Sequence, residues 1–111
     1  MNWIPLTEEA QLSQILEKST TVPQVIFKHS TRCSVSSMVL SRLDRSDTPE
    51  IIDFYLLDLI KHRNISNRIA KDFKVSHESP QVLLIKNREC VYDESHMGIS
   101  MAELADQAAK N

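Results

Sequence analysis

One stretch decides how the rest of the sequence is interpreted, and it reads Gln24-Val25-Ile26-Phe27-Lys28-His29-Ser30-Thr31-Arg32-Cys33-Ser34-Val35-Ser36. It begins with an apolar run that suits a buried strand and continues through a polar turn to a cysteine. Helix-compatible sequence follows at once, so the pattern predicts a strand, a short loop and a helix with Cys33 in its first turn. The free N–H groups and partial positive charge of a helix N-terminus favour a thiolate. The stretch therefore predicts a reactive cysteine that needs no metal.

Length and composition set limits on the rest of the chain. The whole sequence, residues 1–111, has the size of a single domain and the apolar and charged fractions of an ordinary globular protein. A single glycine excludes a glycine-rich phosphate loop, and the net charge of -2 argues against a nucleic-acid partner. No segment resembles a signal peptide or a membrane span, so we expect no membrane association and a cytoplasmic location, where thiols stay reduced.

The hydrophobic pattern predicts helices that alternate with strands. The expected elements are a helix from Thr7 to Lys18 with Thr7 as N-cap, a strand from Gln24 to Lys28, a helix after Cys33, a strand from Ile51 to Asp58, a helix from Lys61 to Phe73, a strand from Gln81 to Lys86, a short antiparallel strand from Cys90 to Tyr92, and a last helix with the capping box Ser100 to Glu103. This order predicts an α/β domain with a central four-stranded mixed sheet and helices on both faces.

The element order, the position of Cys33, and Ser79-Pro80 before a later strand together resemble the thioredoxin fold. In that family the proline is cis and faces the catalytic cysteine, and the backbone just before it pairs with the bound thiol partner. The resemblance therefore implies that Cys33 is the nucleophile, that Pro80 is the cis-proline, and that Ser79 contacts substrate. It also implies that Ser36 stands where dithiol members have a second cysteine.

The chain is similar, over essentially its whole length, to the YtxJ-type monothiol bacilliredoxins. Members of that family carry Thr-Cys-Pro-Ile-Ser, and the corresponding stretch here is Arg32-Cys33-Ser34-Val35-Ser36, with serine in place of the proline. The resemblance implies a thiol–disulfide oxidoreductase that takes bacillithiol from client proteins onto Cys33. Bacillithiol would be the thiol co-substrate, S-thiolated proteins would be the partners, and no cofactor would be bound.

Two other functions are compatible with a thioredoxin-like chain that has one candidate nucleophile. The first is an iron–sulfur carrier of the monothiol glutaredoxin kind, but the Cys-Gly-Phe-Ser and Gly-Gly motifs of those carriers are missing from this sequence. The second is a non-catalytic thioredoxin-like adaptor, in which Cys33 would be an ordinary thiol.

The cations near Cys33 are candidate substrate-binding residues. Lys28, His29 and Arg32 add positive charge that favours a thiolate. Lys28 and Arg32, together with Lys74, could also receive an anionic group of a low-molecular-weight thiol, although solvated charge that only confers solubility is the usual case.

Ser36, Cys90 and the histidines have alternative roles that the sequence leaves open. The Ser36 hydroxyl could donate to the Cys33 thiolate, one helical turn away, or have no role. Cys90 could resolve a mixed disulfide, but it lies on another predicted strand, which favours a small packed side chain. The four histidines show no zinc-finger or His-Glu-x-x-His spacing, so no metal site is expected.

Overall fold

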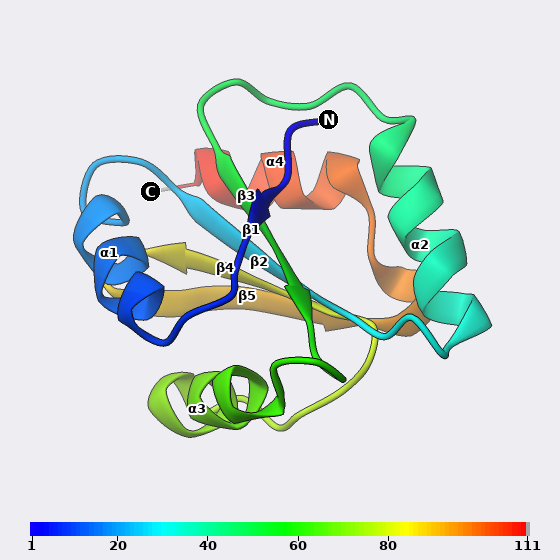
Figure 1. Ribbon diagram of the computed structural model, residues 1–111. Coiled ribbons are helices and arrows are strands. Elements are labelled where there is room, and N and C mark those ends of the chain that lie inside the picture. Colours follow the sequence, from blue (N-terminus) through cyan, green and yellow to red (C-terminus); the bar gives the residue numbers. More distant parts are fainter. Residues whose placement is uncertain (111) are drawn as a thin grey trace.

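The computed structural model describes residues 1–110, in which a mixed sheet has helices on both faces (Figure 1). The strands are β1 (Ile4–Pro5), β2 (Gln24–His29), β3 (Asp53–Asp58), β4 (Gln81–Lys86) and β5 (Glu89–Ser95). The helices are α1 (Ala10–Lys18), α2 (Ser34–Asp44), α3 (Arg63–Phe73) and α4 (Met101–Ala109), with a 3-10 turn η1 (His96–Gly98) before α4. The predicted α/β class with helices on both faces is therefore confirmed.

The sheet has five strands in the order β1-β3-β2-β4-β5, one more than the sequence predicts. Strands β1 and β2 both run parallel to β3, while β4 is antiparallel to β2 and to β5. The additional strand is β1, which has only two exposed residues, one of them a proline. So short a segment has no periodicity to recognise, and a proline is accepted there because β1 is an edge strand.

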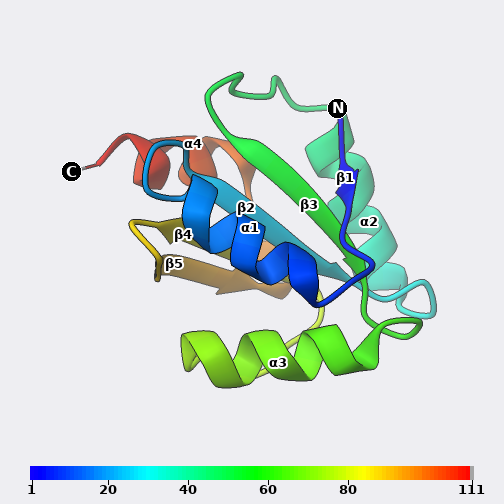
Figure 2. The same cartoon turned by 60° about the vertical axis from the view of Figure 1, so that its left-hand side comes forward.

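The two faces of the sheet form separate apolar clusters, because successive side chains of a strand point to opposite sides. From β2, Val25 and Phe27 pack in the cluster with α2 and α4, whereas Ile26 packs in the cluster with α1 and α3. Figure 2 shows α1 across the near face of the sheet, with α2 and α4 behind it. All six residues of β2 are buried, as expected for a central strand covered on both faces.

Several element boundaries differ from those predicted. Helix α1 begins at Ala10, and Thr7 is not its N-cap; instead the side-chain Oε1 of Gln11 accepts the N–H groups of Thr7 and Glu8 at 2.8 and 3.0 Å. The Gln11 side chain thus holds the segment that leads into the helix, while the N-cap position is occupied by Glu9, whose side chain makes no capping hydrogen bond. One of the two hydrogen bonds of the expected capping box at α4 is present, because Ser100 Oγ accepts the Glu103 N–H at 3.1 Å.

The segment after β4 is more regular than the sequence suggests. Strand β5 extends from Glu89 to Ser95, well beyond the short strand predicted, because it pairs along the whole length of β4. The 3-10 turn η1 was not predicted; three residues are too few for a periodic signal. Within residues 1–110, no helix has the length and apolar character needed to cross a bilayer.

Candidate active site

Cys33 lies where β2 gives way to α2, as the sequence predicts. It occupies the N-cap position of α2 with an extended backbone (φ -112°, ψ 118°), and its side chain is half-buried. Its N–H donates to the Ser30 carbonyl at 3.2 Å, and its carbonyl accepts the Ser37 N–H at 3.1 Å. These two bonds fix the backbone on both sides of the cysteine. The sulfur is thus held at the positive end of a helix, where negative charge is favoured.

Ser36 ties the first turn of α2 to the end of β2. Its side chain is fully buried, and its Oγ lies 2.7 Å from Nδ1 of His29 and accepts the Ser30 N–H at 3.0 Å. Among residues 1–110 these are the hydrogen bonds of that hydroxyl, and none joins it to Cys33. The structure therefore gives Ser36 a role in holding the loop that precedes the cysteine.

His29 is turned into the protein and not toward a substrate in solution. Its side chain is only 8% exposed, and its ring stacks on Phe27 with the ring centroids 6.0 Å apart. Burial lowers the pKa of His29, and the negative charge of Asp58 opposes that change only in part. The neutral imidazole is therefore favoured, which corrects the expectation that His29 adds positive charge to a substrate-binding surface.

Lys28 is also buried, on the opposite face of the sheet. Its side chain is fully inaccessible, and its Nζ lies 3.3 Å from the Ser66 carbonyl in α3 and 3.4 Å from Nδ1 of His77. Burial lowers the pKa of Lys28 from 10.5 to about 8. An ammonium enclosed in this way cannot receive an anionic group of a substrate, so the expected substrate-binding role of Lys28 is wrong.

Pro80 stands beside the end of β2, the strand that leads to Cys33. The Ser79–Pro80 peptide bond is cis, and Pro80 is buried. Because Lys28 pairs with Gln81 in the antiparallel β2–β4 ladder, Pro80 and Ser79 continue that register alongside His29 and the loop to Cys33. The hydroxyl of Ser79 is buried and has no hydrogen-bond partner among residues 1–110.

Comparison with known proteins agrees with this arrangement. Residues 4–104 match the family model described as monothiol bacilliredoxin BrxC. The chain belongs to the monothiol bacilliredoxin family. The resemblance seen in the sequence is thereby confirmed, and with it membership of a family of thiol redox proteins.

Solved structures support the same fold for this bacilliredoxin-family chain. A candidate oxidoreductase with a thioredoxin fold is 30% identical, with a TM-score of 0.82 over 94% of this chain and 91% of its own. Thioredoxin O2 from Arabidopsis thaliana, in its oxidised state, is 20% identical, with a TM-score of 0.69 over 94% and 89% of the two chains. Fasciola hepatica thioredoxin is 14% identical, with a TM-score of 0.71 over 94% of each. The last two show likeness of fold alone.

The second cysteine of this bacilliredoxin-family chain lies at the other end of the sheet. Cys90 pairs with Ile85, which in turn pairs with Gln24, so Cys90 is level with the first residue of β2. Cys33 lies beyond the last residue of the same strand, and six strand residues span about 17 Å. A disulfide requires Cα atoms within about 7 Å, so Cys33 and Cys90 cannot be joined in this fold.

The remaining cations are on the surface, but in different places. Arg32 is exposed and adjacent to Cys33, so it is available to an anionic group there. Lys74 is exposed as well, but it lines a shallow pocket of about 300 Å³ together with Cys90, away from Cys33. The structure thus leaves Arg32 as the cation beside the thiol and places Lys74 elsewhere.

His77 and Ser66 belong to the surroundings of the site, although the sequence gave no reason to choose them. They meet at 3.3 Å between Ser66 Oγ and His77 Nδ1, and both lie against the Lys28 ammonium. His77 belongs to the polar segment between α3 and β4, which has no periodic pattern. The signal that could have identified it is a lysine inside an otherwise apolar central strand, which requires polar partners from neighbouring elements.

Proposed function

We propose that this protein removes bacillithiol from mixed disulfides with client proteins, with Cys33 as its single reactive thiol. The observation that supports this most strongly is the arrangement around Cys33. A half-buried cysteine stands at a helix N-cap, with Ser36 one helical turn further along, and the cis Ser79–Pro80 segment continues the β4 register beside the end of the strand that leads to it. The only other cysteine, Cys90, is too far away to resolve a disulfide internally.

The reaction consists of two thiol–disulfide exchanges. In the first, the Cys33 thiolate attacks the bacillithiol sulfur of the mixed disulfide; a new S–S bond forms, the old one breaks, and the client leaves as a thiolate. In the second, the thiolate of another bacillithiol molecule attacks the adduct and leaves with it as bacillithiol disulfide. Cys33 returns as a thiolate, so electrons and protons balance with bacillithiol as the only reductant.

Cys90 takes no part in this scheme, for a reason that concerns its own surroundings. Burial, and to a lesser degree the charge of Asp93, raise the pKa of Cys90 from 9.0 to about 11. Its thiol also donates to the Tyr92 carbonyl at 3.4 Å. At neutral pH the Cys90 thiol is therefore protonated almost completely, and a protonated thiol is a poor nucleophile.

The test is the intact mass of the protein after incubation with oxidised bacillithiol and, separately, with oxidised glutathione. We expect the oxidised bacillithiol to add one bacillithiol per chain. Cys33→Ser should abolish the adduct, whereas Cys90→Ser, the matched control, should retain it. The glutathione arm reports selectivity: a smaller or slower adduct supports bacillithiol as the preferred thiol.

Two outcomes would contradict the proposal. An adduct that survives Cys33→Ser would place the reactive thiol elsewhere. A wild-type protein that loses two mass units and carries no adduct would contain an internal disulfide, which a monothiol route does not allow.

A further inference from the structure

The feature that the proposed reaction does not use is the buried lysine of the central strand. Lys28 is fully inaccessible, and no carboxylate within residues 1–110 lies within ion-pair distance of it. Among the described residues, the hydrogen-bond partners of its ammonium are the carbonyl of Ser66 and Nδ1 of His77. A buried cation without a carboxylate partner is costly, and an apolar side chain would be more stable at such a position. Stability alone therefore does not account for Lys28.

The contacts of Lys28 connect β2 with two other parts of the chain, α3 and the segment that follows it. Ser66 belongs to α3, whereas His77 belongs to residues 74–80, the segment that leads from α3 to β4 and contains Ser79 and Pro80. The ammonium can only donate hydrogen bonds, so Nδ1 of His77 must be the acceptor, and the ring must be neutral with its one N–H on Nε2. Ser66 Oγ lies 3.3 Å from the same nitrogen and supports it from α3.

The other attachments of this segment leave its middle dependent on His77. At its end, the Pro80 carbonyl accepts the His96 N–H at 2.9 Å. One residue before His77, the Ser76 carbonyl accepts Nε2 of the buried Gln81 at 3.0 Å. Val75, at the start of the segment, packs against the apolar cluster of α1 and α3 and donates its N–H to the Ala70 carbonyl at 3.2 Å. Glu78 lies 3.3 Å from the exposed His96 ring, and such surface contacts contribute little. Between Ser76 and Pro80, the contacts of the His77 imidazole with Lys28 and Ser66 are thus the side-chain hydrogen bonds through which the described residues join the segment to the core.

We propose that Lys28 is a positioning residue for the thiol site: through the neutral ring of His77, it holds residues 74–80 where Ser79 and Pro80 lie beside the end of β2, next to the loop that leads to Cys33. This rests on the proposed function, since it concerns capture of the mixed disulfide at that site. Lys28 is buried while His77 is exposed, and neither side chain is bonded to Cys33, so the attachment affects how well substrate binds more than the exchange at sulfur.

Acid should release this attachment, because His77 can accept from Lys28 only while Nδ1 is unprotonated. The groups that face His77 are Lys28 from β2, Arg63 and Ser66 from α3, and Glu78 from its own segment. Burial and the two cations lower the pKa of His77, while Glu78 raises it. Below that lowered pKa an imidazolium would face the ammonium, and the contact would become repulsive.

The experiment measures backbone hydrogen exchange of residues 75–79 together with KM and kcat for release of bacillithiol from a bacillithiolated peptide. For Lys28→Met we expect about tenfold faster exchange in this segment, as for loss of a hydrogen bond to a charged group. KM should rise by a similar factor while kcat changes little. The melting temperature should be unchanged or higher, because a buried cation has been removed. If Lys28 contributed only packing, the substitution would lower the melting temperature.

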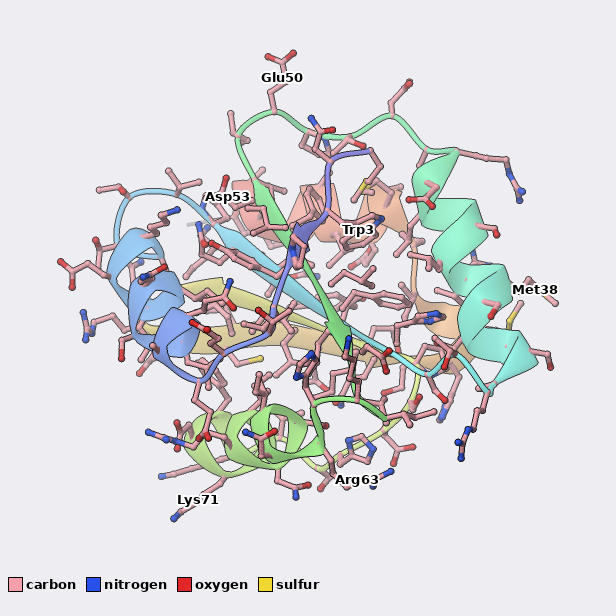
Figure 3. The ribbon with its side chains drawn as sticks, viewed as in Figure 1. Trp3, Met38, Glu50, Asp53, Arg63 and Lys71 are labelled. Atoms are coloured by element: carbon pink, nitrogen blue, oxygen red, sulfur yellow. The ribbon has the colours of Figure 1, made fainter. Side chains whose placement is uncertain are left out.

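Variants of His77 supply the rescue. His77→Gln keeps an acceptor that does not titrate, so we expect segment exchange and KM close to those of the wild type and no rise in KM as the pH falls to 5. His77→Leu removes the acceptor and should behave like Lys28→Met. Lys71→Met is the matched control, because it removes the same charge from the exposed face of α3, where Figure 3 shows Lys71 pointing away from the sheet.

The hydrogen-exchange and kinetic measurements together distinguish failure of this inference from failure of the proposed function. The role of the attachment would be overturned if Lys28→Met kept the hydrogen-exchange rates and KM of the wild type. It would also be overturned if His77→Gln and His77→Leu changed those two quantities equally. If the wild type does not act on the peptide, the proposed function fails, and the hydrogen-exchange arm still decides whether Lys28 holds the segment. If Lys28→Met does not fold, the His77 pair decides the same question.

Discussion

At the scale of single residues, Ser36 is the side chain whose surroundings matter most for the position of Cys33. Its hydroxyl satisfies one backbone group of the loop, the Ser30 N–H, and one side chain of β2, His29. Both contacts are buried, where water cannot replace a lost partner. One oxygen atom thus connects strand, loop and helix around the thiol.

We expect Ser36→Ala to lower the free energy of unfolding by about 1–3 kcal/mol, the usual cost of leaving a buried polar group without a partner. Urea denaturation followed by circular dichroism measures this. The control is Ser37→Ala, the exposed neighbour in α2, for which we expect a change within about 0.5 kcal/mol. Equal effects of the two substitutions would show that the bonds of Ser36 contribute nothing to stability.

At the scale of elements, the position of the thiol depends on how α2 is fixed along its length. Its first turn is bound through Ser36, and Val39 and Leu43 bury its inner face. Its last turn is bound to the N-terminal segment, since Nε1–H of Trp3 donates to Oδ1 of Asp44 at 2.7 Å. The Trp3 ring also lies 5.7 Å from Phe27 and 5.9 Å from Phe54, between centroids. The segment of β1 therefore secures the far end of the helix that presents Cys33.

We expect Trp3→Phe to cost about 1 kcal/mol, because it loses the bond to Asp44 and keeps an aromatic ring in the cluster. Trp3→Ala should cost clearly more, since it also loses the ring contacts. Asp44→Asn retains an acceptor oxygen and should change stability least. Circular dichroism in urea is the measurement, because Trp3 is the only tryptophan and its fluorescence is lost. A Trp3→Phe variant as unstable as Trp3→Ala would assign the whole effect to the hydrogen bond.

At the scale of the whole molecule, the buried Lys28 and the half-buried Cys90 make stability depend on pH in opposite directions. The pKa of Lys28 is lowered from its ordinary value of 10.5 to about 8 in the folded protein. Between pH 8 and pH 10.5 this lysine is therefore protonated in the unfolded chain and deprotonated in the folded protein. Stability due to Lys28 therefore rises with pH in that window. The pKa of Cys90 is raised from 9.0 to about 11, so the folded protein binds more protons there and stability falls with pH.

We predict that the free energy of unfolding of the wild type rises between pH 8 and pH 9, by at most about 1.4 kcal/mol per pH unit, and levels off above pH 9 as Cys90 opposes Lys28. Lys28→Met should remove the rise. Urea denaturation at a series of pH values, with the two proteins compared at each, isolates the lysine from other groups. A difference between the two proteins that stays constant from pH 7 to pH 10 would show that Lys28 is not shifted.

The sequence by itself determined those features that local pattern can encode. The alternation of apolar strands with amphipathic helices gave the α/β class, and the abrupt change after Phe27 placed Cys33 at the start of a helix. The serine at the start of α4 was predicted as its cap for the same reason, because capping depends on residues three positions apart. The cis Ser79–Pro80 bond was anticipated only through the resemblance to a family.

Only the tertiary structure decided what the residues next to Cys33 face. Lys28 and His29 are adjacent in β2 and were both expected to bind substrate, but the alternation of the strand turns Lys28 toward α3 and His29 toward α2. Whether such side chains are buried depends on helices that pack from distant parts of the chain. The separation of Cys90 from Cys33 likewise follows from the register of β4 against β2 and β5. Burial and register are set by contacts between residues far apart in sequence, and no local pattern contains them.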